Sequence, residues 1–247
     1  MVRGGVPESP EPPAHFSPLT AYLSQMPLRL PIFPLSVVLF PGNPLPLHIF
    51  EPRYRRMLAD CLASDRRFGI TPMSENAGPP EPGAVGCVAE VRVNQELPDG
   101  RSNIVVVGGL RFTLSRLLEE SLPYLVATVQ TFEDDSGTEP SADDVESLRQ
   151  LSTQYFTGLR ELNDAIPEEL AFPDDAISLS FHVAGSIECD FGVKQRLLAE
   201  RSTARRIKAL ILLLPVLTSA VESGINVHRR AHSNGKGGTF PDVLASQ

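Results

Sequence analysis

Leu30–Tyr54, LPIFPLSVVLFPGNPLPLHIFEPRY, constrains the fold more than any other part of the chain. Its apolar residues form short runs, and prolines at positions 31, 34, 41, 44, 46 and 52 separate those runs. Proline has a fixed φ and no N–H to donate to a β-ladder, so it confines strands to short segments and to sheet edges. The stretch therefore predicts the start of a small, tightly turned β-barrel.

The residues after this stretch continue the barrel. After Pro52, which suits a first helical turn, apolar residues recur at spacings of three and four, and this predicts an amphipathic helix that covers one end of the barrel. Gly108-Gly109 predicts a bend or a bulge between two strand segments. The predicted elements are a helix over 52–63, strands over 85–93, 104–107, 110–114 and 124–132, and a turn at 98–100.

The second half of the chain has a helical period. Glu133–Asp144 is acidic and is broken by Gly137 and Pro140, so we expect a hinge there. Pro215 falls inside the last helical pattern and predicts a kink near Ile211. The predicted helices are one with an apolar face of Leu148, Leu151, Tyr155, Leu159 and Leu162, one over 174–185 that starts at Asp174-Asp175, one over 193–200, and one from the capping residue Ser202 to Glu222.

These elements predict an α+β fold in which a small mixed β-barrel over 28–133 precedes a C-terminal helical bundle over 141–223. Residues 1–27 are rich in proline and small polar residues, and residues 224–247 contain a Gly-rich segment. Such compositions do not bury enough apolar surface to offset the entropy of ordering. We therefore expect a disordered arm and a flexible tail at the two ends.

Charge and cysteine content limit the class of protein. The formal net charge is −8, which disfavours binding to a phosphate backbone. Cys61, Cys87 and Cys189 are widely spaced and form no Cys-x-x-Cys pair, as is typical of a reduced protein with buried thiols. The N-terminus shows no secretory pattern, and no apolar run approaches the length of a membrane span. A cytoplasmic location is expected.

Several segments, in order along the chain, resemble the N-terminal substrate-binding domain of the Lon family of ATP-dependent proteases. Besides the opening stretch they are Gly83–Glu90, Leu97–Gly100, Gly108–Phe112, Pro123–Ala127, Gln195–Leu198 and Arg205-Arg206. The resemblance extends from Leu28 to Glu222. It implies a PUA-like barrel, of the kind shared with RNA-binding domains, and a helical bundle that together hold substrate proteins.

The chain departs from the Lon proteases beyond this region. Those proteases continue into an ATPase module, whereas this sequence contains no Gly-x-x-x-x-Gly-Lys-Ser/Thr phosphate loop. Its only lysines are Lys194, Lys208 and Lys236, and the first two lie within the part that resembles the substrate-binding domain. We therefore expect a stand-alone domain with no ATPase or peptidase activity, no catalytic residues and no cofactor.

Other candidate groups have simpler structural explanations. His48 lies between Leu47 and Ile49 in a predicted strand and is expected to be structural. His228 and His232 have the i, i+4 spacing of a metal pair but lack a third ligand nearby, so no metal is expected. The barrel half has one basic concentration: Arg53, Arg55, Arg56, Arg66 and Arg67. It motivates a PUA-like RNA-binding module as the alternative function, although the acidic body and the absence of aromatic motifs disfavour nucleic acid.

The leading hypothesis is a non-catalytic module that binds polypeptides, either unfolded chains or client proteins, and serves proteolysis or quality control as an adaptor. Its expected partners are those polypeptides and a protease or ATPase subunit. The binding surface is expected in a groove between barrel and bundle or on the loop 71–82, because loops on rigid scaffolds often carry recognition. Met73, Phe50 and Tyr54 are the candidate contact residues.

Overall fold

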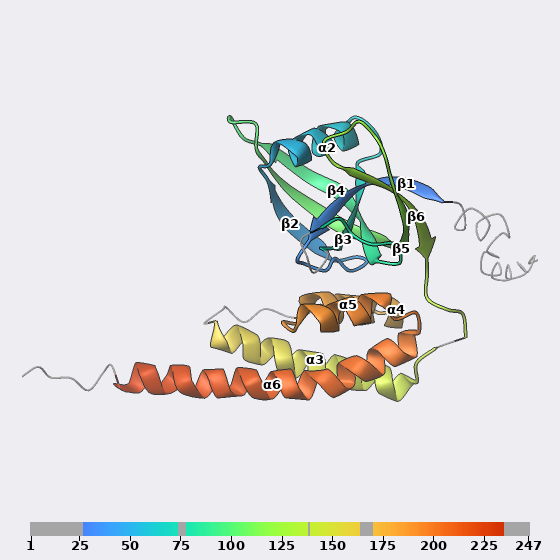
Figure 1. The fold of residues 1–247 in the computed structure, drawn as a ribbon. Coiled ribbons are helices and arrows are strands. Elements are labelled where there is room, and N and C mark those ends of the chain that lie inside the picture. Colours follow the sequence, from blue (N-terminus) through green and yellow to red (C-terminus); the bar gives the residue numbers. More distant parts are fainter. Residues whose placement is uncertain (1–26, 74–77, 138, 164–169, 235–247) are drawn as a thin grey trace, which may run out of the picture.

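The computed structural model describes residues 27–73, 78–137, 139–163 and 170–234, with side chains beyond residue 223 described only for Ile225. The described chain forms a β-barrel stacked on a layer of helices (Figure 1). Helix α2 covers the barrel end that faces away from the helical layer, as predicted. The predicted α+β organisation is confirmed. None of the helices in these residues is long and apolar enough to cross a membrane.

The barrel consists of six strands and one helix in the described residues. They are β1 (Leu28–Leu35), β2 (Pro44–Ile49), α2 (Pro52–Leu62), β3 (Arg67–Pro72), β4 (Val85–Glu96), β5 (Ser102–Leu118) and β6 (Leu125–Phe132). The strand order is β2-β5-β4-β3-β1-β6, and a further pairing of β5 with β6 closes the barrel. Strands β1 and β3 are parallel, and the other pairs are antiparallel.

Strand β2 of the described sheet pairs with β5 alone, so its other edge is free along its whole length. Its leucines and Ile49 turn inward, whereas Pro44, Pro46 and His48 are exposed. Two of its residues are thus prolines without an N–H, which reduces the donors available to an additional strand. Pro44 and Pro46 are therefore at an edge, as predicted. Pro31 and Pro34 are not, because they lie in β1, which pairs with β3 on one side and β6 on the other.

Strand β5 is continuous through the predicted bend at Gly108-Gly109. A register shift opposite Cys87 and Ala89 marks the predicted bulge there. At this point the loop before β2 crosses β5, where Gly42 N–H donates to the Gly108 carbonyl at 2.8 Å. A Cβ on Gly108 would lie 2.0 Å from the Phe40 carbonyl oxygen, so only glycine fits this crossing.

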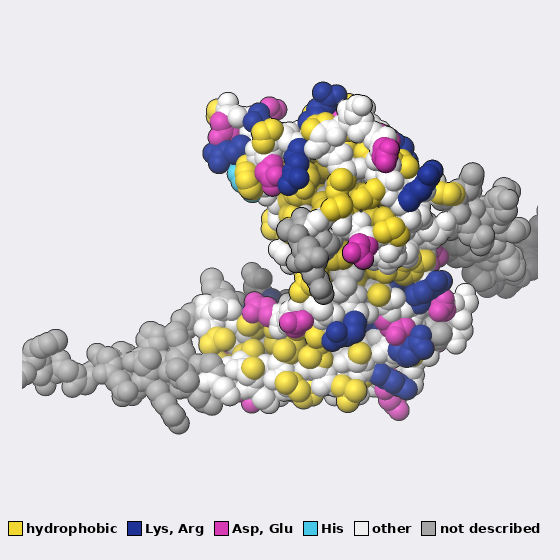
Figure 2. All heavy atoms as spheres, viewed as in Figure 1, with side chains coloured by type: hydrophobic (Ala, Val, Ile, Leu, Met, Phe, Trp, Pro, Cys, Tyr) yellow, Lys and Arg dark blue, Asp and Glu magenta, His cyan; other side chains and the backbone are white. Residues whose placement is uncertain are grey.

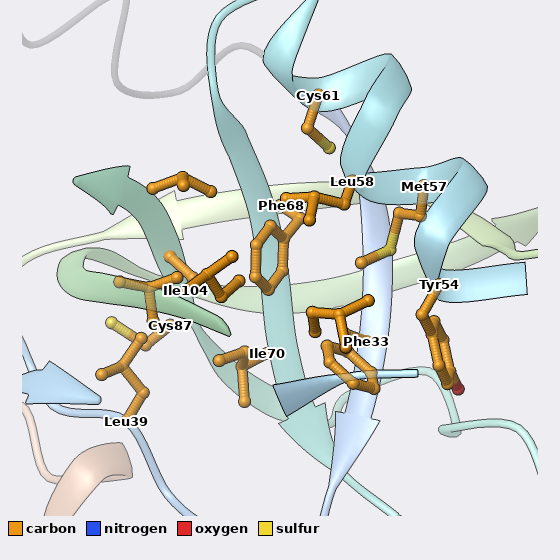
Figure 3. Close-up of a cluster of buried hydrophobic side chains, with 14 residues drawn as sticks. Phe33, Leu39, Tyr54, Met57, Leu58, Cys61, Phe68, Ile70, Cys87 and Ile104 are labelled. Atoms are coloured by element: carbon orange, nitrogen blue, oxygen red, sulfur yellow. The ribbon is translucent and has the colours of Figure 1, made fainter. Parts of the chain in front are cut away.

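Large side chains fill the barrel from the sheet and from α2 (Figure 3). Met57, Leu58 and Cys61 point from α2 toward Phe33 and Phe68. In a second cluster of the barrel core, the Phe112 ring occupies space left by two glycines, since a Cβ on Gly69 or Gly86 would lie within 2.7 Å of it. Burial raises the pKa of the Cys61 and Cys87 thiols to about 12, which keeps both protonated.

Strand β3 was missed in the sequence. Arg66-Arg67 stands out there only as a basic pair, yet Arg67 opens a buried strand that pairs with β1 on one side and β4 on the other. The segment RFGITP contains a glycine and ends at a proline, so its local pattern is weak. Its place in the sheet depends on long-range pairing.

The helical layer contains α3 (Ala142–Leu162), α4 (Ala176–Ser186), α5 (Phe191–Ala199) and α6 (Thr203–Asn234). The predicted starts are confirmed by capping contacts: Asp175 accepts from the Ser178 N–H at 2.8 Å, and Ser202 Oγ accepts from the Arg205 N–H at 3.3 Å. The apolar face of α3 packs on α6 through Leu148 and Tyr155.

Helix α6 runs on to Asn234 rather than ending at Glu222, so the predicted tail was wrong for its first residues. Gly224 costs only about 1 kcal/mol in a helix and does not stop one by itself. Pro215 lies inside α6 without ending it, and the part of α6 near the barrel lies at an angle to the long remainder (Figure 1). Residues 1–26 and 235–247, in the predicted arm and tail, lie outside the described residues.

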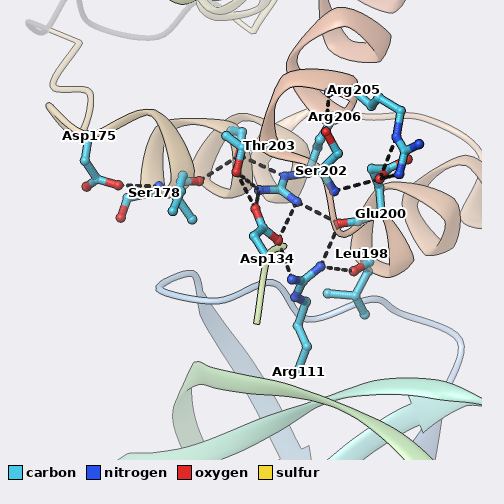
Figure 4. A network of polar contacts seen from close by, with 12 residues as sticks. Arg111, Asp134, Asp175, Ser178, Leu198, Glu200, Ser202, Thr203, Arg205 and Arg206 are labelled. Carbon is cyan, nitrogen blue, oxygen red and sulfur yellow. Dashed lines mark hydrogen bonds and ion pairs between the residues drawn. The ribbon is translucent and has the colours of Figure 1, made fainter. Parts of the chain in front are cut away.

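A buried ionic network fixes the barrel against the bundle (Figure 4). Asp134, just after β6, pairs with Arg111 of β5 and with Arg206 of α6. The side chains of Arg111, Arg206 and Asp134 are 2%, 0% and 7% exposed, so none of the three charges is solvated. The segment 133–144, where a hinge was expected, is therefore held at its first residues by the ion pairs of Asp134.

Two buried guanidinium groups share one carboxylate, and neutral groups accept further hydrogen bonds from both of them. Arg111 donates to the Leu198 and Glu200 carbonyls at 2.9 and 2.7 Å, at the C-terminal end of α5. Helix C-termini leave carbonyls unpaired and carry a partial negative charge, so they suit a cation. Arg206 also lies 3.8 Å from the centre of the Phe181 ring, a cation–π contact.

Gly108→Ala should destabilise the barrel, because its Cβ would collide with the backbone of Phe40. We expect a loss of about 2–3 kcal/mol in unfolding free energy, measured by urea denaturation. Gly109→Ala is the matched control, since its Cβ would meet no described atom closer than 3.5 Å and should change stability by less than about 1 kcal/mol. Equal losses of unfolding free energy for the two variants would contradict the close approach of Phe40 to Gly108.

Asp134→Asn should lower the unfolding free energy by about 3–5 kcal/mol, because two buried arginines lose their counter-charge. The neighbouring Asp135 pairs with Arg201, and both side chains are about half exposed. Asp135→Asn should therefore cost less than about 1 kcal/mol in the same chemical denaturation. A small loss for both variants would show that the network does not hold the junction.

Stability should also fall in acid because of Asp134. Burial alone would raise the pKa of this carboxyl, but hydrogen bonds from Arg206 and Thr203 and the two arginine charges hold its pKa below the ordinary value. A depressed pKa adds stability above the unfolded value, and this stability is lost as the pH falls through the folded value. The stability difference between wild type and Asp134→Asn should accordingly shrink below about pH 4, and a difference that stays constant down to about pH 2 would refute this.

Candidate functional site

A groove lies between barrel and bundle, at one of the two binding surfaces expected from the sequence. It encloses about 310 Å³. One wall is the loop between β1 and β2 with the start of β2, and the other is formed by the end of α4 and the start of α5. The lining residues are 36–40, Asn43, Pro44, Leu45, Gly185, Cys189, Phe191 and Lys194.

The barrel wall is held by one residue that belongs to the core of the bundle. Phe40 is fully buried among bundle residues, and its ring lies 6.4 Å from that of Phe181 in α4. Asn43 fixes the same loop, since its N–H donates to the Phe40 carbonyl at 3.1 Å and its side-chain amide donates to the His182 carbonyl at 3.4 Å. The groove therefore has a rigid wall.

The bundle wall brings a cation and a thiol to the groove. Lys194 Nζ donates to the Gly185 carbonyl at 3.0 Å, and burial lowers the pKa of this amine. Burial raises the pKa of the Cys189 thiol, although the charge of Lys194 opposes the shift. A thiol that stays protonated is a poor nucleophile, so this pair suits binding better than covalent chemistry.

Apolar side chains at the mouth of the groove remain accessible. Val37 on the barrel wall and Phe191 on the bundle wall are 41% and 37% exposed. Val38 and Leu45, which also line the groove, are half-buried. An exposed apolar pair across a cleft is suited to receive an apolar side chain.

The three residues predicted as contacts do not come together. Met73 is 45% exposed and adjoins the groove, since its N–H donates to the Leu35 carbonyl at 3.2 Å, next to the wall residue Ser36. Phe50 is 58% exposed but lies between β2 and α2, where its ring stacks with that of His48. Tyr54 requires a correction: it is 7% exposed and its ring packs 4.1 Å from that of Phe33, in the barrel core.

Sequence reasoning missed Val37 and Phe191. Val37 belongs to an apolar run, which by itself predicts burial. Phe191 follows Asp190, whose side chain accepts from the Gly192 N–H at 2.8 Å and caps α5, so Phe191 is placed at the start of a helix and 37% exposed. The cap can be recognised in the sequence, but the exposure of the ring depends on the position of the barrel. The loop 71–82 is described only in part, because residues 74–77 lie outside the described residues.

The other candidate groups have structural partners. His48 is exposed and bonds through Nδ1 to Asn103 Oδ1, directly across the β2–β5 ladder, at 2.7 Å. The side chains of His228 and His232 lie outside the described residues. The basic concentration is largely paired: Arg53 with Glu51, Arg56 with Asp60 and Arg67 with Asp65, while Arg66 donates to the Val91 carbonyl.

Comparison with known proteins gives consistent matches over the described fold. The chain is 26% identical over 220 residues to the Lon protease of Cytophaga hutchinsonii and 28% identical over 215 residues to that of Anaeromyxobacter dehalogenans. These alignments cover 85% and 82% of this chain but 27% and 25% of the two proteases. The chain thus spans about a quarter of the length of these relatives.

Two solved structures share the fold. A Lon N-terminal domain protein from Xanthomonas campestris superposes with a TM-score of 0.58 at 24% identity, covering 75% of this chain and 98% of that one. The N-terminal domain of the Mycobacterium avium complex Lon protease gives 0.56 at 16% identity, covering 78% and 98%. The family model of the ATP-dependent protease La (LON) substrate-binding domain matches residues 29–215. That match includes the barrel, the groove and most of the bundle, and the chain therefore belongs to the LON substrate-binding domain family.

Proposed function

We propose that the groove between barrel and bundle binds exposed apolar segments of other polypeptides. The observation that carries the proposal is the accessible pair Val37 and Phe191, which face a cleft whose barrel wall is held by the buried Phe40. Membership of a substrate-binding family supports the same conclusion. We include Met73 as a further contact residue, because it is 45% exposed and its backbone is hydrogen-bonded to Leu35, next to the groove residue Ser36.

The groove favours unfolded clients for a physical reason. A folded protein buries most of its large apolar side chains, whereas an unfolded one exposes them to water. A cleft of about 310 Å³ accepts one or two such side chains and not a folded surface. Removing apolar area from water contributes roughly 25 cal/mol per Å², so binding through this groove alone is weak and tolerant of sequence.

We further propose that the chain is non-catalytic, acts in the cytoplasm, and works with a separate protease or ATPase subunit. The chain matches the substrate-binding part of Lon proteases and about a quarter of their length, which supports a role in holding clients. Lys194, which lies in the groove, already donates to the Gly185 carbonyl. An adaptor of this kind recognises clients, and the partner supplies the chemistry.

A PUA-like RNA-binding module is the weaker alternative. It would need unpaired arginines facing the phosphate backbone, whereas Arg53, Arg56 and Arg67 each pair with a carboxylate within 2.9 Å. The net charge of −8 adds a long-range repulsion. We therefore favour polypeptide clients.

Val37→Asp and Phe191→Asp should each weaken binding of an unfolded polypeptide by roughly tenfold, because a charge replaces apolar contact in the groove. Fluorescence anisotropy of labelled, reduced and carboxymethylated α-lactalbumin measures the affinity, and the native, disulfide-intact protein serves as the folded competitor. Val93→Asp is the matched control, since Val93 is 53% exposed on the barrel strand β4.

The control should bind like wild type, and the native competitor should not displace the probe. If Val93→Asp weakens binding as much as the groove variants, the groove is not the site. A different set of results would replace the proposal with the nucleic-acid alternative. In that case the polypeptide probe does not bind, a labelled transfer RNA does bind, and the double variant Arg55→Glu/Arg56→Glu no longer binds the RNA.

A further inference from the structure

Helix α6 has a second apolar surface that the proposed groove does not use. Its inner face packs on the bundle through the buried Ile207, Leu210 and Leu214. On its outer face Leu212 and Val216 are 76% and 66% exposed, more than any other large apolar residue described. Figure 2 shows hydrophobic side chains gathered along the helical layer on the viewed side of the molecule.

The outer face continues into a hollow beside α5. This hollow encloses about 460 Å³ and is floored by Leu197, Leu213 and other apolar residues. Leu212 and Val216 stand on its α6 side, one helical turn apart. Contiguous apolar surface of this kind, on a helix face that no described element covers, is typical of an interaction site.

Charge changes sign along this face. Arg205 and Lys208 precede the apolar pair, and Glu222 follows it; all three are exposed. Arg205 pairs with Glu200 at 3.0 Å. The side chains of Lys208 and Glu222, by contrast, make no hydrogen bond or ion pair with any residue that the structure describes. The face is thus basic at one end, apolar in the middle and acidic at the other end.

Two copies of this face are complementary in charge when the helices run antiparallel, because the basic end of each then lies opposite the acidic end of the other. Lys208 and Glu222 lie equally far from Pro215, on either side of it, and Leu212 and Val216 lie close to that midpoint. In an antiparallel pair of α6 helices, Lys208 of each chain would face Glu222 of the other, and Leu212 would lie near Val216. A two-fold axis makes every contact twice, as in an isologous dimer. We propose that this face of α6 pairs with the same face of a second copy of the chain.

Sedimentation velocity of the full chain over a concentration series tests the proposal. Wild type should show a reversible monomer–dimer equilibrium, and Leu212→Glu should shift it to monomer. Lys208→Glu and Glu222→Lys should each weaken self-association about tenfold, because each places two like charges opposite one another. Arg116→Glu, a charge reversal at an exposed barrel position that pairs with no described side chain, is the matched control and should dimerise like wild type.

A mixture of Lys208→Glu and Glu222→Lys gives the decisive result. In a mixed pair, the introduced carboxylate at position 208 of one chain would face the introduced amine at position 222 of the other. The native Glu222 of the first chain would face the native Lys208 of the second, so an equimolar mixture should regain wild-type association. Circular dichroism confirms that each variant is folded, which exposed substitutions on a helix should preserve. A wild type that stays monomeric throughout, a Leu212→Glu variant that dimerises normally, or a mixture no tighter than its components would overturn the proposal.

Discussion

The carboxylate of Asp134, shared by two buried arginines, holds the two halves of the molecule in one arrangement. Arg111 comes from the barrel and Arg206 from the bundle, so separating the two subdomains would break at least one of the two buried ion pairs of Asp134. One carboxylate balances only one of the two positive charges. Carbonyls at the end of α5 accept hydrogen bonds from Arg111, and the ring of Phe181 makes a cation–π contact with Arg206. A buried ion pair adds little net stability over an apolar core, and its effect here is to fix the orientation of two layers.

That orientation defines the groove. Because barrel and bundle are held at one angle, the loop between β1 and β2 meets the start of α5, and Val37 and Phe191 are left on opposite sides of a cleft. Phe40 adds an apolar contact next to the ionic one, since it leaves the barrel and enters the bundle core. The crossing at Gly108 then sets where that loop leaves the barrel. Phe40, Gly108 and the ionic network, which are far apart along the chain, thereby shape the same groove.

Local rules predicted much of the fold. Pro52, Asp175 and Ser202 each start a helix as expected, because proline suits the first turn and short polar side chains accept from unpaired N–H groups. Gly108-Gly109 marks a bulge because a strand glycine signals close backbone approach. These features depend on a few neighbouring residues, and the sequence contains those residues in full.

The parts that could not be predicted depend on distant partners. Strand β3 is defined by its pairing with β1 and β4 rather than by its own six residues. Arg111 and Arg206 look like any surface arginines until the fold brings Asp134 between them. Tyr54 is different, because a local signal was available: it belongs to the apolar period that predicted α2, and its ring lies in the core with the other buried residues of that helix. Burial decides which apolar residues can bind a client, and burial is a property of the whole fold.

Site-specific photocrosslinking can show whether clients bind in the groove between barrel and bundle. A photoreactive amino acid is placed at position 37, in the groove, or at position 93, on the barrel surface, and the chain is irradiated with an unfolded polypeptide. We predict strong crosslinks from position 37 that an excess of unlabelled unfolded polypeptide abolishes, and weak ones from position 93. Equal crosslinking from the two positions, or crosslinking from position 93 alone, would contradict binding in the groove.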